Sequence, residues 1–90
     1  MSAHVGDMIQ WSEEALWDEV FGEEYERVLV AKRGGVGHII SEDIQPDGTK
    51  TYTIFFERTA RVHTCMRDEF QVLCNAQGVP VPKQWPPTIG

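Results

Sequence analysis

The stretch that decides the fold runs from residue 33 to residue 70 and reads RGGVGHIISEDIQPDGTKTYTIFFERTARVHTCMRDEF. It opens with three glycines in four positions, at 34, 35 and 37, where the backbone can bend sharply with positive φ. The β-branched residues Val36, Ile39 and Ile40 follow this bend, and such residues favour a strand. The opening of the stretch therefore predicts a sharp corner that leads into a strand.

Two further strands follow in the same stretch. Asp47-Gly48 separates the first strand from an alternating segment, 52–56, and a polar turn of this kind between apolar runs is typical of a β-hairpin. The next run, 61–66, alternates again, with Val62 and Met66 on the face expected to point inward and Cys65 on the opposite face. The stretch thus predicts three short antiparallel strands.

The residues before this stretch predict one strand and one helix. Apolar residues at even spacing in 5–11 indicate an opening strand. Ser12 is a suitable helix N-cap, and apolar residues then recur at three- and four-residue steps, which predicts a short acidic amphipathic helix over 13–21 within an insertion of residues 12–27. Residues 28–31 fit either a strand or a helix.

The residues after the stretch predict a closing strand and a tail. The segment 67–69 fits a tight 3₁₀ turn, and 70–73 a short strand that returns to pair with the opening strand. From residue 75 the chain is rich in proline, which cannot donate a hydrogen bond to a sheet, so we expect a mobile tail over 75–90. Trp85 in this tail could dock back onto the folded part or onto a partner.

Together these elements predict a mostly β protein: a small SH3-like barrel of about five antiparallel strands over residues 1–74, with the helical insertion after the first strand and the Pro-rich tail behind. Closure into a barrel removes exposed strand edges in so short a chain. The predicted core consists of Val5, Ile9, Trp11, Val36, Ile39, Tyr52, Ile54, Phe56, Val62, Met66, Phe70 and Val72.

Length and composition restrict the class of protein. Ninety residues form one domain, and 41% hydrophobic with 24% charged residues is an ordinary globular composition. No apolar run approaches the roughly 20 residues that cross a bilayer, and the first residues do not resemble a secretory signal. We therefore expect a cytoplasmic protein without a membrane partner.

The charge pattern favours a protein partner. The formal net charge is −6, which argues against a DNA-binding surface because phosphate neutralisation needs clustered Lys and Arg. Acidic residues gather in 13–26, whereas Arg58, Arg61 and Arg67 lie around the last predicted hairpin. An acidic face opposite a basic edge suits a protein partner better than a membrane.

The same stretch resembles a known family. The segments KRGGVGHI (32–39), TYTIFF (51–56), RV (61–62) and CMRDEF (65–70) are similar to the NifZ-type accessory proteins of nitrogen fixation. The chain differs from that family in its acidic segment 12–27, at Thr64, where the family has glycine, and at Met66, where it has arginine. The resemblance implies a chaperone-like, nitrogenase-associated role: a factor that binds the nitrogenase molybdenum-iron protein directly and assists its maturation or protection, without catalysis of its own.

Three side chains could carry metal or thiol chemistry. His63 and Cys65 share a strand face, and Cys74 could approach as a third soft ligand, although nothing in the spacing selects a complete set. The alternative is a solvated histidine and two reduced thiols. Residues two apart on a strand have β-carbons about 6–7 Å apart, too far for a nucleophile–base hydrogen bond. We therefore expect no enzyme activity, no bound metal and no cofactor.

The predicted helix supplies the leading candidate for a binding site. Trp17 and Phe21, beside Glu13 and Glu24, would give an aromatic surface with a carboxylate rim that suits a basic patch on a protein partner. The alternative is a solvated outer face of a packed helix. Arg61, Arg67 and Trp85 are further candidates for partner contact.

The leading hypothesis is thus a non-catalytic protein-binding accessory factor. The first alternative is an RNA- or ribosome-associated module that uses Arg58, Arg61 and Arg67. The second is a metal-binding redox module built on His63, Cys65 and Cys74.

Overall fold

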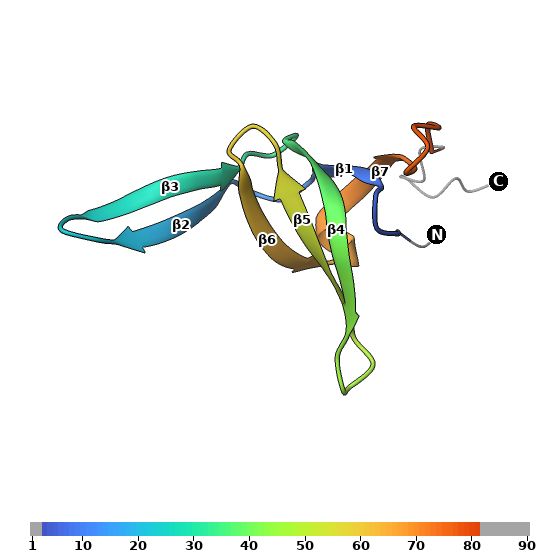
Figure 1. Ribbon diagram of the computed structural model, residues 1–90, viewed down its shortest axis with the longest axis horizontal. Coiled ribbons are helices and arrows are strands. Elements are labelled where there is room, and N and C mark those ends of the chain that lie inside the picture. Colours follow the sequence, from blue (N-terminus) through green and yellow to red (C-terminus); the bar gives the residue numbers. More distant parts are fainter. Residues whose placement is uncertain (1–2, 82–90) are drawn as a thin grey trace.

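The computed structural model describes residues 3–81 and is mostly β (Figure 1). No helix among these residues has the length and apolar character needed to span a bilayer. In chain order the elements are β1 (Met8–Trp11), β2 (Leu16–Phe21), β3 (Tyr25–Ala31), β4 (Val36–Ile44), β5 (Lys50–Phe56), β6 (Arg61–Met66), the 3₁₀ helix η1 (Arg67–Glu69) and β7 (Phe70–Cys74).

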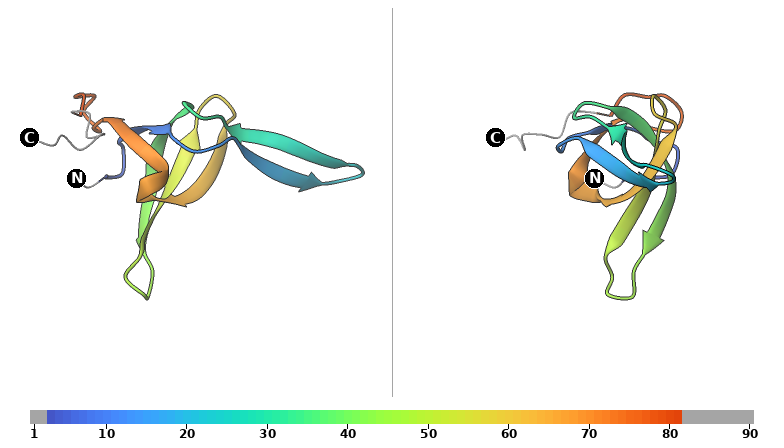
Figure 2. Two further views of the ribbon diagram at one scale, coloured as in Figure 1. Left: turned by 180° about the vertical axis from the view of Figure 1, so that it is seen from behind. Right: turned by 90° about the vertical axis from the view of Figure 1, so that its left-hand side faces the viewer.

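The strands form two antiparallel sheets. Five of them lie in the order β6-β5-β4-β1-β7, and this sheet is strongly bent. The other two, β2 and β3, pair only with each other and project away from the five-stranded sheet as a long hairpin (Figure 1). Seen from behind, the same hairpin again stands clear of the rest of the chain (Figure 2).

The glycine corner forms as predicted. Gly34 has φ +88°, a conformation that favours glycine, and its N–H donates to the carbonyl of Trp11 at 2.7 Å. Gly37 serves a different purpose, since a Cβ there would lie 2.6 Å from the Phe55 carbonyl oxygen and 2.8 Å from Cγ2 of Ile54. The corner therefore needs glycine once for backbone conformation and once for close packing of β4 on β5.

The predicted hairpin over Asp47-Gly48 is confirmed. Gly48 has φ +89°, and its N–H donates to the Gln45 carbonyl at 2.9 Å. The Asp47 carboxylate accepts from the Thr49 N–H at 2.9 Å, and this bond holds the pKa of Asp47 below its ordinary value. The turn sets the register in which β4 and β5 pair from Gly37↔Phe56 to Ile44↔Lys50.

The predicted closing segment is also confirmed. Arg67–Glu69 is a 3₁₀ helix, and the Glu69 carboxylate accepts from the Met66 N–H at 3.0 Å. β7 then pairs antiparallel with β1, as expected from the sequence. Because β6 and β7 are the two edges of the sheet, η1 connects one edge to the other.

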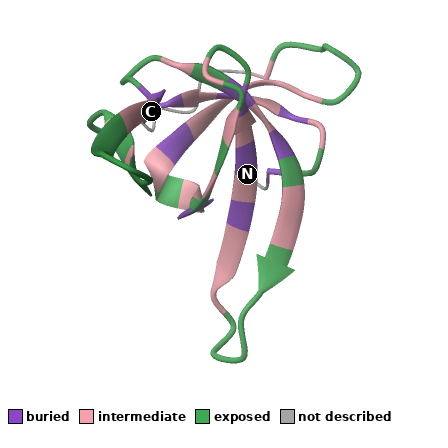
Figure 3. Ribbon diagram, turned by 60° about the vertical axis from the view of Figure 1, so that its left-hand side comes forward, coloured by how far each residue is buried: buried purple, intermediate pink, exposed green. Residues whose placement is uncertain are grey.

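The buried residues are concentrated on the strands of the bent sheet, while most of the loops and the outer part of the β2–β3 hairpin are exposed (Figure 3). Seven of the predicted core residues are buried and Val72 packs against them, but Val5, Val36, Val62 and Met66 are exposed. Val30, Ala31, Cys65 and Ala3 are buried instead. The buried hydrophobic residues are Ala3, Ile9, Trp11, Val30, Ala31, Ile39, Tyr52, Ile54, Phe56, Cys65 and Phe70.

The predicted orientation of β6 is wrong, because the face expected to point inward points toward solvent. The strand buries Cys65 and half-buries His63, whose ring lies edge-on to Trp11 with centroids 5.8 Å apart, while Val62 and Met66 face solvent. The pattern of apolar residues predicts the wrong inward face because both faces of this short strand carry one or two apolar groups. The register with β5, which pairs Tyr52 with Cys65, decides the orientation.

The predicted acidic helix is wrong, and residues 16–21 are a strand. Apolar residues at 16, 17, 20 and 21 fit a helical stripe, but they also fit a hairpin arm that is exposed on both faces. Aromatic and β-branched residues are enriched in this segment and in 25–30, which favours strands. Residues 28–31, ambiguous in the sequence, belong to β3.

The predicted mobile tail is wrong over residues 75–81, and its remainder lies outside the described residues. Residues 75–81 turn back on the sheet: Pro80 forms a bridge with Cys74, and the Val81 N–H donates to the Leu73 carbonyl at 3.0 Å. Trp85 and the rest of the Pro-rich segment lie outside the described residues.

Candidate binding face on the β2–β3 arm

The hairpin formed by β2 and β3, called the arm below, is the most exposed element among residues 3–81. Its outer residues, from Glu19 to Arg27, are all exposed, and so is Trp17 on β2. Phe21 is 76% exposed, Tyr25 54% and Trp17 48%. Exposed aromatic residues that gather on one element are typical of an interaction surface.

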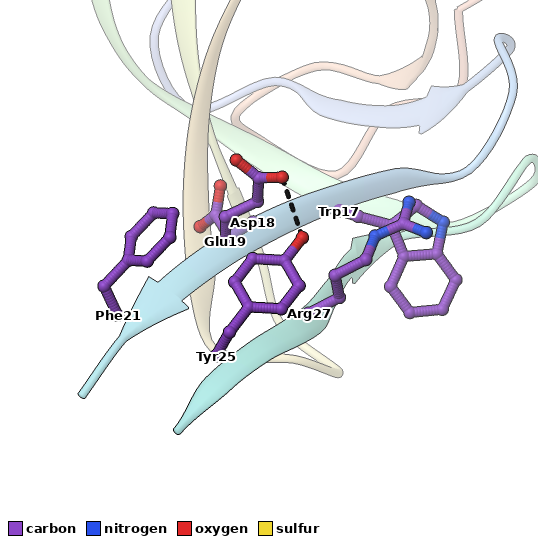
Figure 4. A pocket seen from close by; sticks show the side chains of 6 residues that line it. All are labelled: Trp17, Asp18, Glu19, Phe21, Tyr25 and Arg27. Atoms are coloured by element: carbon purple, nitrogen blue, oxygen red, sulfur yellow. Dashed lines mark hydrogen bonds between the residues drawn. The ribbon is translucent and has the colours of Figure 1, made fainter. Parts of the chain in front are cut away.

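The strand register places the aromatic residues on one side of the arm. Phe21 pairs with Tyr25, Glu19 with Arg27, and Trp17 with Leu29. Residues directly opposite each other share a face, and residues two apart on a strand share it too. We call the surface made by Trp17, Glu19, Phe21, Tyr25 and Arg27 the arm face. It borders a shallow hollow, which Asp18 also lines (Figure 4).

The outer end of the arm face is an aromatic pair held by a carboxylate. The rings of Phe21 and Tyr25 lie 5.4 Å apart at 46°. The Tyr25 hydroxyl donates to Oε1 of Glu19 at 2.8 Å, a bond that raises the pKa of Tyr25 above its ordinary value. Two aromatic rings and an acidic group are thus fixed beside each other at the exposed end.

The inner end of the arm face is a cation stacked on an aromatic ring. The guanidinium carbon of Arg27 lies 5.1 Å from the ring centroid of Trp17, within the range of a cation–π interaction. Glu19 is directly opposite Arg27, yet Arg27 takes part in none of the three ion pairs found in residues 3–81. Glu19 is engaged with Tyr25, and Arg27 with Trp17 (Figure 4).

The arm, together with the residues that lead into it, carries the net charge of the protein. Residues 12–31 hold seven of the fourteen acidic residues and one of the eight basic residues, so this segment accounts for the whole formal charge of −6. The other seventy residues are formally neutral. A strongly acidic projection on a neutral body directs the electrostatic field of the molecule toward one place.

Polar contacts hold the inner end of the arm against the sheet. Asp18 lies 3.4 Å from Nη1 of Arg61 on β6, and the Thr59 hydroxyl donates to the Val30 carbonyl at 2.5 Å. Val30 and Ala31 are part of the core, with Leu16 packed against it. The arm is therefore anchored at one end and free of the sheet at the other.

The predicted partner-binding residues are only partly brought together. Trp17 and Phe21 do share one surface, on a strand and not on a helix. Glu24 lies in the turn between β2 and β3, and Glu13 precedes β2, where its carbonyl accepts from Nε of Arg33 at 3.5 Å. Tyr25 and Arg27 were missed, although the aromatic and β-branched residues on both sides of Gly22 contained a signal for a hairpin.

The predicted basic edge is largely engaged within the protein. Arg61 pairs with Asp18, and the guanidinium of Arg67 stacks 5.0 Å from the Phe70 ring while Nη1 donates to the Phe70 carbonyl at 2.9 Å. Arg67 Nε is buried without a hydrogen-bond partner. Of the three arginines, Arg58 alone is exposed. Trp85, the remaining candidate, lies outside the described residues.

The three candidate metal ligands do not assemble into a site. His63 and Cys65 lie on the same face of β6, as predicted, but residues 3–81 contain no group of three His, Cys, Asp or Glu side chains placed to hold a metal ion. Burial, together with the carboxylates of Glu69 and Asp68, raises the pKa of Cys65 to about 12. Cys65 is therefore a protonated core residue at neutral pH, and Cys74 is a half-buried free thiol.

Comparisons with known proteins give no assignment: no protein-family model, curated protein or solved structure matches this chain significantly.

Proposed function

We propose that this protein is a non-catalytic binding module that docks a basic protein partner on the arm face. The observation that carries the proposal is the coincidence, on one projecting hairpin, of three exposed aromatic rings and five acidic residues against one basic residue. Aromatic residues are enriched at the centres of protein interfaces, and surrounding charges select the partner and speed its approach. A basic surface is complementary to this arrangement.

The five-stranded sheet is the support for the arm in this proposal, and we assign it to the SH3-like class. The strand order, the projecting hairpin after the first strand and the 3₁₀ helix between the two edge strands support that assignment. Small folds of this kind have many functions, so only the arm supports a binding function.

The resemblance of residues 32–70 to NifZ-type proteins suggests the partner. In that interpretation the module is a cytoplasmic accessory factor, and the surface it binds belongs to the nitrogenase molybdenum-iron protein. The residues that carry the resemblance lie in the glycine corner, β4, β5, β6, η1 and the first residue of β7, whereas the proposed contact lies on β2 and β3. The support and the contact surface can therefore be tested separately.

The test is affinity capture with matched variants. Trp17→Ser with Phe21→Ser removes two rings of the arm face and should abolish capture of the partner from native cells, including the molybdenum-iron protein if the resemblance holds. Ile44→Ser is the control, because Ile44 is 73% exposed and equally apolar but lies at the far end of β4. Unchanged capture by a folded double variant, or equal loss in the control, would exclude the arm face as the interface.

A further inference from the structure

The stacked Arg27 gives the arm face a more specific chemistry than a general acidic surface. An exposed arginine directly across from a glutamate ordinarily pairs with it, as opposite charges on facing strands attract. Arg27 faces Glu19 in the register but stacks on Trp17 instead. The Trp17 ring is thus a surface that holds a guanidinium in this protein.

We infer that the arm face recognises an arginine-containing extended segment of a basic partner, and that Arg27 is an internal competitor that occupies the Trp17 ring until the partner arrives. The inference rests on the proposed function and names the partner group and the residue that regulates access to it. An incoming guanidinium replaces that of Arg27 over Trp17, and Arg27 is then free to turn toward Glu19.

Charge complementarity supports this occupant. Glu23, Glu24 and Glu26 surround the outer end of the arm, beside the Phe21–Tyr25 pair. Within residues 3–81, arginine or lysine lies over the rings of Trp17, Tyr52 and Phe70, and no such contact covers Phe21 or Tyr25. The outer rings therefore offer a second position for a cation from the same segment.

The length of the arm also suits an extended partner. The two ring positions lie four residue pairs apart along the ribbon, at Trp17↔Leu29 and Phe21↔Tyr25 at either end of the face. Four residues of strand span about 13 Å, which an extended peptide covers with alternate side chains on the same side. An alternating sequence of arginine and glycine would present guanidinium groups at this spacing.

The experiment measures binding of a fluorescent peptide of alternating arginine and glycine to the purified full-length protein. We expect Arg27→Gln to bind this peptide about two- to fivefold more tightly, because the competing guanidinium is removed and the arm becomes more acidic. Trp17→Leu, which keeps an apolar side chain but removes the π face, should weaken binding by a similar factor. A peptide of alternating glutamate and glycine should not bind.

The possible results separate this inference from the proposed function. Unchanged or weaker binding of the arginine peptide by Arg27→Gln would overturn the competitor role, since Arg27 would then be neutral or part of the interface. Equal binding by Trp17→Leu and the wild type would exclude recognition by the ring. If either occurs while Trp17→Ser with Phe21→Ser still abolishes partner capture, the proposed function stands and only the arginine mechanism fails.

Discussion

Gly37 tolerates less change than the other glycines of the glycine corner. A Cβ at this position would lie 2.6 Å from a backbone oxygen of the neighbouring strand, and that backbone cannot move without disturbing the β4–β5 ladder. At Gly22, in the turn of the arm, an added Cβ meets nothing within 4 Å. The same substitution should therefore be much more destabilising at Gly37 than at Gly22.

We expect Gly37→Ala to lower the free energy of unfolding by about 1–3 kcal/mol through overpacking. Gly22→Ala should change it by no more than about 0.5 kcal/mol, as is usual for surface substitutions. Denaturant unfolding followed by circular dichroism measures both. Equal stability of the two variants would mean that β4 and β5 do not approach each other as closely as described.

The two cysteines should differ sharply in reactivity. With a pKa of about 12, Cys65 has about one thiolate in ten thousand at pH 8, and it is buried as well. Cys74 is half-buried on an edge strand. We expect iodoacetamide to modify Cys74 in the folded protein and Cys65 only after unfolding, as followed by peptide mass spectrometry. Similar rates at both residues in the native protein would contradict the burial of Cys65.

At the scale of the elements, the arm and the sheet are stabilised differently. The inner end of the arm contributes Val30 and Ala31 to the core, whereas residues 19–27 are exposed throughout. The five-stranded sheet has its own core around Trp11 and Phe56, whose rings meet edge-on at 5.9 Å. The outer arm should thus be dispensable for folding.

Replacing residues 18–27 by a short glycine-serine turn tests this separation. The change removes five acidic residues and one basic residue, so the formal net charge falls from −6 to −2. It also removes the partly exposed Asp18–Arg61 pair, and surface ion pairs contribute about 0–1 kcal/mol. We expect the trimmed protein to keep its β spectrum with a midpoint within a few degrees of the wild type.

Thermal unfolding by circular dichroism checks stability, and elution from an anion-exchange column checks the charge. The trimmed protein should elute at clearly lower salt. Loss of cooperative unfolding after trimming would show that the outer arm belongs to the folding core, and the arm could then no longer be treated as a separate binding element.

At the scale of the whole molecule, the distribution of charge has a larger effect on partner recognition than the total charge. A formal charge of −6 spread evenly would only favour solubility. Here the arm and the four residues before it, 12–15, carry all of it, and the rest of the chain is formally neutral. Since screening shortens the reach of exposed charges to about 10 Å at 0.1 M salt, recognition by the arm should depend on ionic strength, while the stability of the sheet should not.

Several features could be read from the sequence because local chemistry fixes them. Gly34 and Gly48 adopt positive φ where the sequence predicts turns, and the 3₁₀ turn before Phe70 follows from its short polar segment. Alternation in 52–56 correctly placed Tyr52, Ile54 and Phe56 in the core. In each case the residues that predict the structural feature lie within a few positions of it in the sequence.

Tertiary structure alone decided the rest. The segment 16–21 is compatible with a helix and with a strand, and its pairing with 25–31 makes it a strand. Likewise, the pairing of Cys65 with Tyr52 turns β6 so that Val62 faces solvent. The strand conformation of 16–21 and the orientation of β6 both depend on hydrogen bonds to another strand. The periodicity of a single segment does not specify which strand it pairs with or in which register.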